Sequence, residues 1–442
     1  MKTLGCRPQR HLTLFFSSLL SSALLAGCAT TAPRPIDRRD GFPLDPREEL
    51  NGPFSESVQR GCEALADGDG RAAEAAFAAA RSGDPRRLAA EIGWIEALVL
   101  ENRATEALPD CEKLLAAGDP TLPLLVACGE AKARAGRVVE AHALYRRAVA
   151  RDGKRAGVND RAEELRLASR DRWLSLARAA ADRSEWARSR ADIAEAIALA
   201  PESSSLRTAA GDIESQSGEK AAALKRYREA MEIEPRNPAV LEKTGNLALE
   251  LGDYALAVSA FERLARSDPR AVSRAAEARL AFRVANWPPA EREAAASPRL
   301  TRAGAAELVW WMCPEVREAR VNSGVIASDA VSRRDSRAIT RAVALGLLEV
   351  DGEKHRVSPD AVLSLPAAAK LLVRLLAILK PGPGPVACVR KSSRGPLTNA
   401  EALRVSTACG LISDREGPGV SGSAFLRALD RARSLVAEKG AS

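Results

Sequence analysis

Much of the chain consists of short segments in which small and apolar residues recur every three or four positions, separated by glycine, proline or polar turns. Residues three or four apart share one face of a helix, so this spacing predicts amphipathic helices. The abundance of Ala, Leu, Arg and Glu favours the same structure, because these side chains lose little freedom in a helix. The sequence therefore predicts an all-α fold.

Within this pattern, small residues, an aromatic residue and a proline recur in one order with a period of 34 residues. Two weaker units, around Cys111 and Ile193, bring the number to six between about residues 54 and 271. Some 14 extra residues, 156–169, separate the third and fourth units and could extend two helices or loop out. The clearest sets are Gly61, Gly68, Ala73, Phe77, Ala80 and Pro85; Gly211, Gly218, Ala223, Tyr227, Ala230 and Pro235; Gly245, Gly252, Ala257, Phe261, Leu264 and Pro269; and Gly129, Gly136, Ala141, Tyr145 and Ala148.

This pattern resembles the tetratricopeptide repeat (TPR), in which each unit is a helix–turn–helix. The resemblance implies a solenoid over residues 53–296, made of about six units and a capping helix over 272–285. It also implies a concave groove, lined by the first helix of each unit, that binds extended peptides or helices. The alternative is a helical bundle without repeats. The candidate groove residues are Glu130, Arg134, Arg178, Asp212, Glu242 and Asn246.

The N-terminus carries a basic stretch and then an apolar run over 12–25 that is too short to span a bilayer comfortably. The run ends in Leu25, Ala26, Gly27 and Cys28, which resembles the lipobox of bacterial lipoproteins. The resemblance implies a signal peptide over 1–27 and acyl chains on Cys28, facing the periplasm from the outer membrane because Ala29 follows rather than Asp. An ordinary cleaved signal is the alternative. Residues 28–52, rich in proline and charge, are expected to form a flexible tether.

The last part of the chain has a different pattern, in which amphipathic helices alternate with turn-rich loops. Their order resembles the S-layer homology domain, with units over 297–380 and a further divergent unit over 381–442. The family motif Thr-Arg-Ala-Glu is matched by Thr301, Arg302 and Ala303, whereas Leu363–Pro366 and Val420–Ser423 depart from it. The resemblance therefore implies one candidate glycan contact, Arg302. The alternative is a packing or partner-docking module that binds no glycan.

Charge and sequence motifs mainly argue against nucleic-acid binding and against enzyme, cofactor or metal sites. The formal charge falls from +8 to +5 once Lys2, Arg7 and Arg10 are removed, and basic residues alternate with acids, which is typical of solvated helix faces rather than a nucleic-acid surface. His142 and His355 are isolated and expected at the surface. Nucleophile, phosphate-loop and zinc motifs are missing, so we expect no enzyme, cofactor or metal site.

Six cysteines remain after removal of the signal and the lipid attachment site: Cys62, Cys111, Cys128, Cys313, Cys388 and Cys409. Disulfides are permitted in the oxidising compartment that a lipoprotein faces. The resemblance packs the helices of Cys111 and Cys128 together, so they could be bridged, and Cys388 and Cys409 could staple the last unit. Otherwise these residues are buried small hydrophobes.

Together these patterns predict a membrane-anchored scaffold lipoprotein of the cell envelope that binds a protein partner through its solenoid. Two alternatives stay open. One is an envelope tether whose C-terminal region binds cell-wall polysaccharide. The other is a pilotin or outer-membrane assembly lipoprotein that escorts subunits through the groove.

Overall fold

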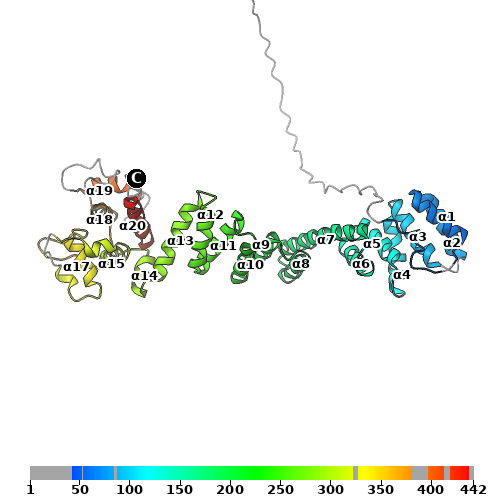
Figure 1. Cartoon of the computed structure of the whole chain (residues 1–442). Helices are drawn as coiled ribbons and strands as arrows, with labels where there is room; N and C mark the ends of the chain where they lie inside the picture. The colour runs from blue at the N-terminus through cyan, green and yellow to red at the C-terminus, as the bar shows by residue number, and fades with distance from the viewer. Residues whose placement is uncertain are drawn as a thin grey trace, which may run out of the picture. The chain divides into compact units, whose positions relative to one another are not determined.

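The computed structural model describes residues 42–51, 53–83, 87–321, 327–379, 397–412 and 419–437 (Figure 1). In these ranges the chain is helical, with isolated β-bridges and no strands, as predicted. None of the helices described is both long and apolar enough to cross a membrane. The chain forms two compact units, residues 1–176 and 177–442.

The first unit consists of three helix–turn–helix pairs in chain order. Consecutive helices pack on one another, and the first helices of neighbouring pairs, α1 with α3 and α3 with α5, also pack together. This arrangement gives a continuous face made of first helices. The pairs are α1 (Glu56–Asp67) with α2 (Gly70–Gly83), α3 (Arg87–Leu100) with α4 (Ala104–Ala116), and α5 (Leu122–Arg134) with α6 (Val138–Arg151).

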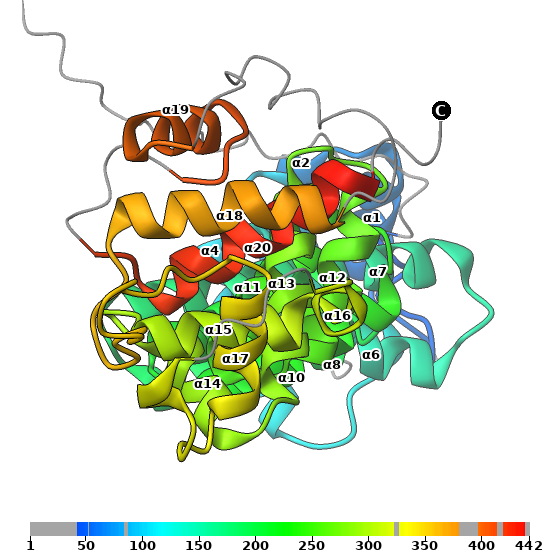
Figure 2. The same cartoon turned by 90° about the vertical axis from the view of Figure 1, so that its left-hand side faces the viewer.

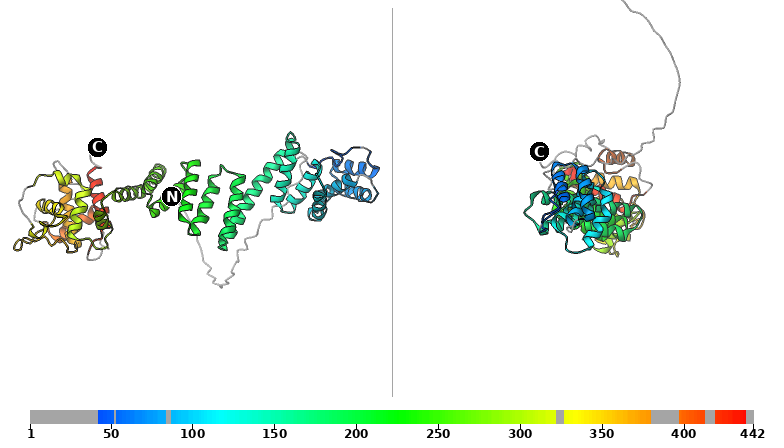
Figure 3. Two further views of the ribbon diagram at one scale, coloured as in Figure 1. Left: turned by 90° about the horizontal axis from the view of Figure 1, so that it is seen from below. Right: turned by 90° about the vertical axis from the view of Figure 1, so that its right-hand side faces the viewer.

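The boundary between the two units lies within α7 (Ala156–Asp182), which has 27 residues. The expected insertion at 156–169 therefore extends one helix, rather than two helices or a loop. Three more pairs follow in the residues described: the last part of α7 with α8 (Trp186–Leu199), α9 (Ser204–Gln216) with α10 (Lys220–Ile233), and α11 (Pro238–Leu251) with α12 (Tyr254–Ala265). Figure 3 shows the green helices α9 to α12 side by side. The six predicted pairs are confirmed.

An aromatic ring packed on a glycine recurs in these pairs. A Cβ atom built on Gly245 would lie 2.7 Å from the ring of Phe261, and one on Gly129 would lie 2.8 Å from the ring of Tyr145. Both rings are buried. The glycine thus leaves the space that the ring of the second helix fills, which explains why these residue types recur at a fixed spacing.

The C-terminal domain has one continuous hydrophobic core, which runs from Trp287 to Ala432. The segments expected as separate units over 297–380 and 381–442 therefore share a core in the part described. Between the last pair and this domain lies α13 (Ala271–Ala285). The helices of the domain are α14 (Pro289–Ala296), α15 (Arg302–Met312), α16 (Pro314–Glu318), α17 (Ser336–Ala344), α18 (Leu365–Leu379), α19 (Asn399–Ala408) and α20 (Gly422–Ala437). Figure 2 shows α18 between α19 and α20, and it packs on both.

A ring of three backbone hydrogen bonds joins the segments that precede α15, α18 and α20. The N–H of Leu300 donates to Val420 O (2.9 Å), that of Val420 to Leu363 O (3.4 Å), and that of Leu363 to Leu300 O (2.8 Å). The next residue in each segment is Thr301, Ser364 or Ser421, and its hydroxyl accepts the N–H three residues later. The three motifs compared in the sequence are therefore equivalent positions of a pseudo-threefold arrangement.

Substituting the glycine under an aromatic ring tests the packing of the repeats. Gly245→Ala should destabilise the protein by about 1–3 kcal/mol, because the added methyl group overlaps the buried ring of Phe261. Gly118→Ala is the matched control, since a Cβ there meets nothing within 4 Å, and should change stability by less than about 0.5 kcal/mol. Urea unfolding followed by circular dichroism measures both. Equal stability of the two variants would contradict this account of the packing.

Candidate protein-binding surfaces

Residues 42–51, which we call the strap, pack on the first unit. Phe42 and Leu44 belong to the core formed by α3 to α6, and Pro46 is also buried. The expectation of a flexible tether over 28–52 is therefore wrong for residues 42–51. Positions 42, 44 and 46 alternate with less buried residues, and the bend at Pro43 and the turn over residues 46–49 keep the three apolar side chains against the repeats. The prolines and charges of this segment hid that pattern.

Polar contacts join the strap to two first helices of the repeats, α3 and α5. The N–H of Leu44 donates to Glu96 Oε1 on α3 (3.1 Å). Glu49 accepts the N–H of Leu122 at the start of α5 (3.0 Å) and a hydrogen bond from Arg151 Nε (2.9 Å). The strap thus lies on the face that the TPR resemblance assigns to ligands, and this occupied face was missed in the sequence.

Glu96 is the most unusual polar residue of this surface. It is fully buried, and burial raises its pKa well above the usual range, against the effect of the hydrogen bond from Leu44. Its Oε2 atom has no hydrogen-bond partner. A buried carboxylate with one unpaired oxygen is costly, so such a group is uncommon without a functional or structural reason. The apolar run of α3 contains two acids, Glu91 and Glu96, and among the residues described only Glu91 forms ion pairs, with Arg81 and Arg87.

Two of the predicted groove residues belong to a buried network instead. Glu130 is 4% exposed and accepts hydrogen bonds from both Nε and Nη2 of Arg161 (3.0 Å each), from Arg134 Nε (3.3 Å) and from the hydroxyl of Tyr145 (3.4 Å). These contacts join α5 to α6 and α7. Glu130 and Arg134 therefore hold the repeats together and are not free for a ligand.

In the second unit, two more predicted groove residues link neighbouring repeats. Asp212 on α9 accepts hydrogen bonds from the hydroxyl of Tyr227 (2.7 Å) and from Lys243 Nζ on α11 (2.5 Å). Asn246 on α11 accepts one from Arg274 on α13 (2.5 Å). The bonds from Lys243 and Arg274 join consecutive first helices, so Asp212 and Asn246 help set the packing between units.

The remaining two, Arg178 and Glu242, are exposed. They lie on first helices of different repeats, α7 and α11. The structure therefore does not gather the six predicted residues into one site.

A cavity of about 1,420 Å³ lies between α13, α14 and α20, and we call it the α13 cavity. The helix expected over 272–285 is confirmed, and it packs on α12 through its buried face of Ala271, Ala275 and Ala278. A second apolar stripe of this helix faces the cavity and lines it: Val272, Ala276, Leu280 and Val284. Val272 is 55% exposed.

Arginines surround the α13 cavity. Arg270, Arg292 and Arg427 line it, are exposed, and make no ion pair with any residue described. By contrast, Arg279 pairs with Glu262 (2.7 Å) and Arg283 with Asp430 (3.7 Å). The cavity thus combines an apolar floor with uncompensated positive charge at its edge.

Arg302, the candidate glycan contact, opens α15 and turns towards its own domain. Its guanidinium donates to the carbonyl oxygen of Glu349, its Nε atom is buried without a partner, and burial lowers its pKa. Leu365 and Gly422 occupy the equivalent positions of the pseudo-threefold arrangement. A side chain at Gly422 would overlap the carbonyl oxygen of Ala294. Neither equivalent position offers a second basic group.

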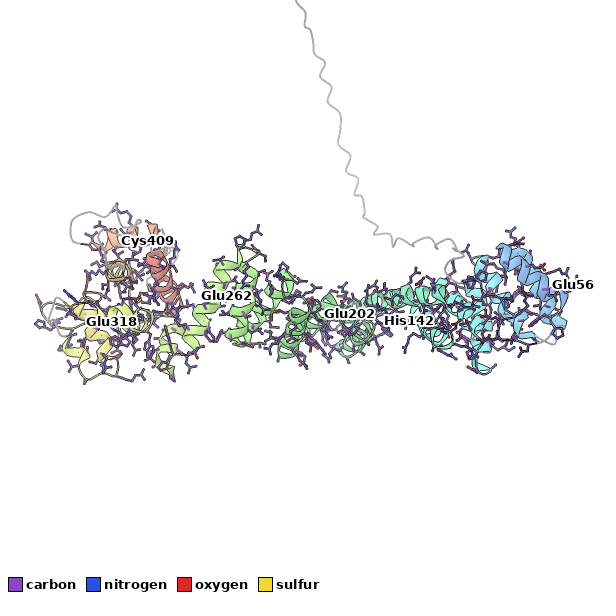
Figure 4. All side chains as sticks on the ribbon, in the orientation of Figure 1. Glu56, His142, Glu202, Glu262, Glu318 and Cys409 are labelled. Atoms are coloured by element: carbon purple, nitrogen blue, oxygen red, sulfur yellow. A yellow bond between two sulfur atoms is a disulfide. The ribbon has the colours of Figure 1, made fainter. Side chains whose placement is uncertain are left out.

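The described residues offer little catalytic chemistry. They contain no cluster of acids, histidines and cysteines that could hold a metal ion. His142, labelled on α6 in Figure 4, is 8% exposed, so the expected surface position is wrong. Burial and the nearby Arg146 and Arg166 lower its pKa. His142 is buried because it lies on the face of α6 that packs inward. His355 is exposed, as expected.

The cysteines divide into bridged and buried groups. Cys111 and Cys128 form the anticipated disulfide between α4 and α5, with Cα atoms 5.4 Å apart. Cys409, labelled at the end of α19 in Figure 4, is also disulfide-bonded, and Cys388, its expected partner, lies outside the described residues. Cys62 and Cys313 are free, and burial raises the pKa of each thiol to about 12. Residues 25–28, the lipobox, also lie outside the described residues.

No protein-family model and no curated protein matches the chain. The TPR2AB domain of yeast Sti1 in complex with pHSP90 is 14% identical, with a TM-score of 0.27, over 51% of this chain and 95% of that one. The pilF protein of Pseudomonas aeruginosa is 18% identical, with a TM-score of 0.23, over 50% and 94%. A TPR protein of Parabacteroides merdae is 12% identical, with a TM-score of 0.22, over 65% and 98%.

These TM-scores are too low to support an argument by themselves. The chain's own geometry shows the fold: six helix pairs with a 34-residue sequence period and a glycine–aromatic contact inside the clearest pairs. The protein is therefore an all-helical TPR-type solenoid followed by a smaller helical domain.

Replacing Glu96 tests its buried, raised-pKa environment. Because the folded-state pKa is raised, its favourable contribution is present below the unfolded pKa of about 4.3 and is lost as the pH rises. Glu96→Gln keeps an oxygen for the Leu44 N–H without the ionisable group, so it should melt several degrees above wild type at about pH 8 and close to it at about pH 4.

The matched control is Glu106→Gln on α4. Arg103 lowers the pKa of that exposed carboxyl group, so its loss should bring no such gain at about pH 8. Thermal unfolding followed by circular dichroism gives both comparisons. A Glu96→Gln protein that melts at or below the wild-type temperature at about pH 8 would show that the buried carboxyl group carries no such cost.

Proposed function

We propose that this protein is a membrane-anchored scaffold lipoprotein of the bacterial cell envelope, and that it binds a protein partner at the α13 cavity. One observation supports the proposal: the α13 cavity has an apolar floor, and Arg270, Arg292 and Arg427 lie at its edge, unpaired with any residue described. Exposed apolar surface rimmed by polar groups is typical of interaction sites. An amphipathic helix with an acidic edge matches both features, since such helices bury their apolar face in a groove.

Anchoring rests on the sequence around Cys28 and on one structural observation. The Cys111–Cys128 disulfide favours an oxidising compartment such as the periplasm. An outer-membrane location with the solenoid in the periplasm accords with Ala29 after the lipobox cysteine. Two acyl chains or more would hold the protein firmly, because a single chain binds a bilayer only weakly.

The tether alternative draws support from the pseudo-threefold C-terminal domain, whose three equivalent motifs are those compared with S-layer homology units. Its basic chemistry is weak, because Arg302 donates to a backbone carbonyl and its two equivalents are Leu365 and Gly422. We therefore favour protein binding over polysaccharide binding. The assembly-lipoprotein alternative is one form of the scaffold, distinguished by the identity of the partner.

Metabolic labelling with a palmitate analogue tests the anchor. Wild-type protein expressed in a bacterial host should incorporate the label, and Cys28→Ser should lose it, because Cys28 supplies the thiol that is acylated. Cys6→Ser is the matched control and should retain the label, since it leaves the lipobox intact. A labelled Cys28→Ser protein, or an unlabelled wild type, would refute lipidation at this site.

Photo-crosslinking in intact envelopes tests the α13 cavity. A photoreactive residue at Val272 should yield a discrete crosslinked protein, and one at Val331, which is exposed but lies outside the cavity, should not. Combining the first with Arg292→Glu and Arg427→Glu should reduce the product several-fold, because the charge that attracts an acidic helix is reversed. Equal products at both positions, or a product that survives the charge reversal, would argue against the proposal.

A further inference from the structure

The strap occupies the ligand face of the first repeats in the way a bound peptide would. Its backbone bends at Pro43 and turns over residues 46–49, and it buries alternate side chains, Phe42, Leu44 and Pro46, against the solenoid. Its backbone N–H at Leu44 donates to a helix side chain, Glu96. Bound peptides are recognised in the same manner, by main-chain hydrogen bonds for affinity and pockets for alternate side chains for specificity.

The acidic end of the strap meets a matching set of donors. Glu49 accepts hydrogen bonds from the N–H of Leu122 and from Arg151, and Glu48 pairs with Arg155. The first of these donors lies at the N-terminus of α5, where backbone N–H groups and the helix dipole favour an anion. The surface therefore binds the two carboxylates, Glu48 and Glu49, that follow the apolar residues of the strap.

The strap leaves part of this surface unsatisfied. Glu96 is fully buried, and its Oε2 atom has no partner although its Oε1 atom accepts from Leu44. Asp45 and Arg47 pair with each other within the strap, and Asp45 also contacts Cys62 on α1. A ligand with one more polar group beside Glu96 would make a contact that the strap does not make.

We propose that the face of α1, α3 and α5 is a second peptide site, that the strap is its internal competitor, and that the ligand displacing it is a partner segment with apolar residues at alternate positions followed by two carboxylates in a turn. Because the strap is tethered, its effective concentration is high, so a free ligand of the same chemistry replaces it only above that concentration or with better contacts. This site belongs to the first unit and the α13 cavity to the second, so either can fail without the other.

The test uses a fluorescent peptide with the strap's own sequence, FPLDPREELN, and the full chain. Leu44→Asp weakens the seated strap by placing a charge in the core, so this variant should bind the peptide at least tenfold more tightly than wild type. Arg151→Glu with Arg155→Glu, added to Leu44→Asp, should abolish binding. Arg137→Glu, a reversal on α6's N-terminal flank away from the strap contacts, is the matched control and should leave binding unchanged. A folded Leu44→Asp protein that does not bind the peptide would overturn the proposal.

A second measurement needs no substitution. Saturating peptide should speed hydrogen exchange at the amide of Leu44 in the wild-type chain, since the displaced strap loses its bond to Glu96. Unchanged exchange at saturation would overturn displacement. Light scattering tests whether the ligand is a second copy of this chain. A wild-type dimer that becomes monomeric in Leu44→Asp would show that the strap of another copy occupies the site, and this result would refute a separate partner.

Discussion

The contact on which the solenoid depends is an aromatic ring seated against a helix at a position with no side chain. Phe77 lies between Gly61 on α1 and Gly93 on α3, so a single ring joins two successive units. Tyr145, Tyr227 and Phe261 each pack on the glycine of their own pair, Gly129, Gly211 and Gly245. Since protein interiors are close-packed, neither partner can change size without a shift of the helices.

This contact also places the surfaces that bind. When second-helix rings fill the space between pairs, the first helices are left to form a common face, and in the first unit that face carries the strap. In the second unit the last first-type helix, α13, is followed by a domain of another pattern instead of a partner helix. Its apolar stripe consequently lines a cavity rather than a repeat interface.

The repeats could be predicted because the ring and the glycine are both rare residue types at a fixed spacing. The three motifs of the C-terminal domain were also compared in the sequence, but Thr301 was set against Leu363 and Val420. The structure shifts this alignment by one residue, because the helix-capping hydroxyls belong to Thr301, Ser364 and Ser421. The placement of Cys111 opposite Cys128 followed from the packing of adjacent helices. Most of the fold could therefore be predicted from local packing rules that require particular residue types.

The sites could not be predicted in the same way, because they depend on which of many charged residues find partners. Glu130 and Asp212 occupy groove positions by spacing, but Arg161 and Lys243 reach them from other helices. The strap combines prolines and charges that are typical of a linker. The sequence does not show that its three apolar residues are buried, because their burial depends on packing against the helices of the repeats.

Hydrogen exchange of the protein in native envelopes, compared with the purified chain, tests the central claim that this solenoid is a scaffold for protein partners. In the envelope, α13 should exchange more slowly because a bound partner covers the cavity, and residues 42–51 should exchange faster wherever a ligand has displaced them. Identical exchange of both segments in the two preparations would contradict the account.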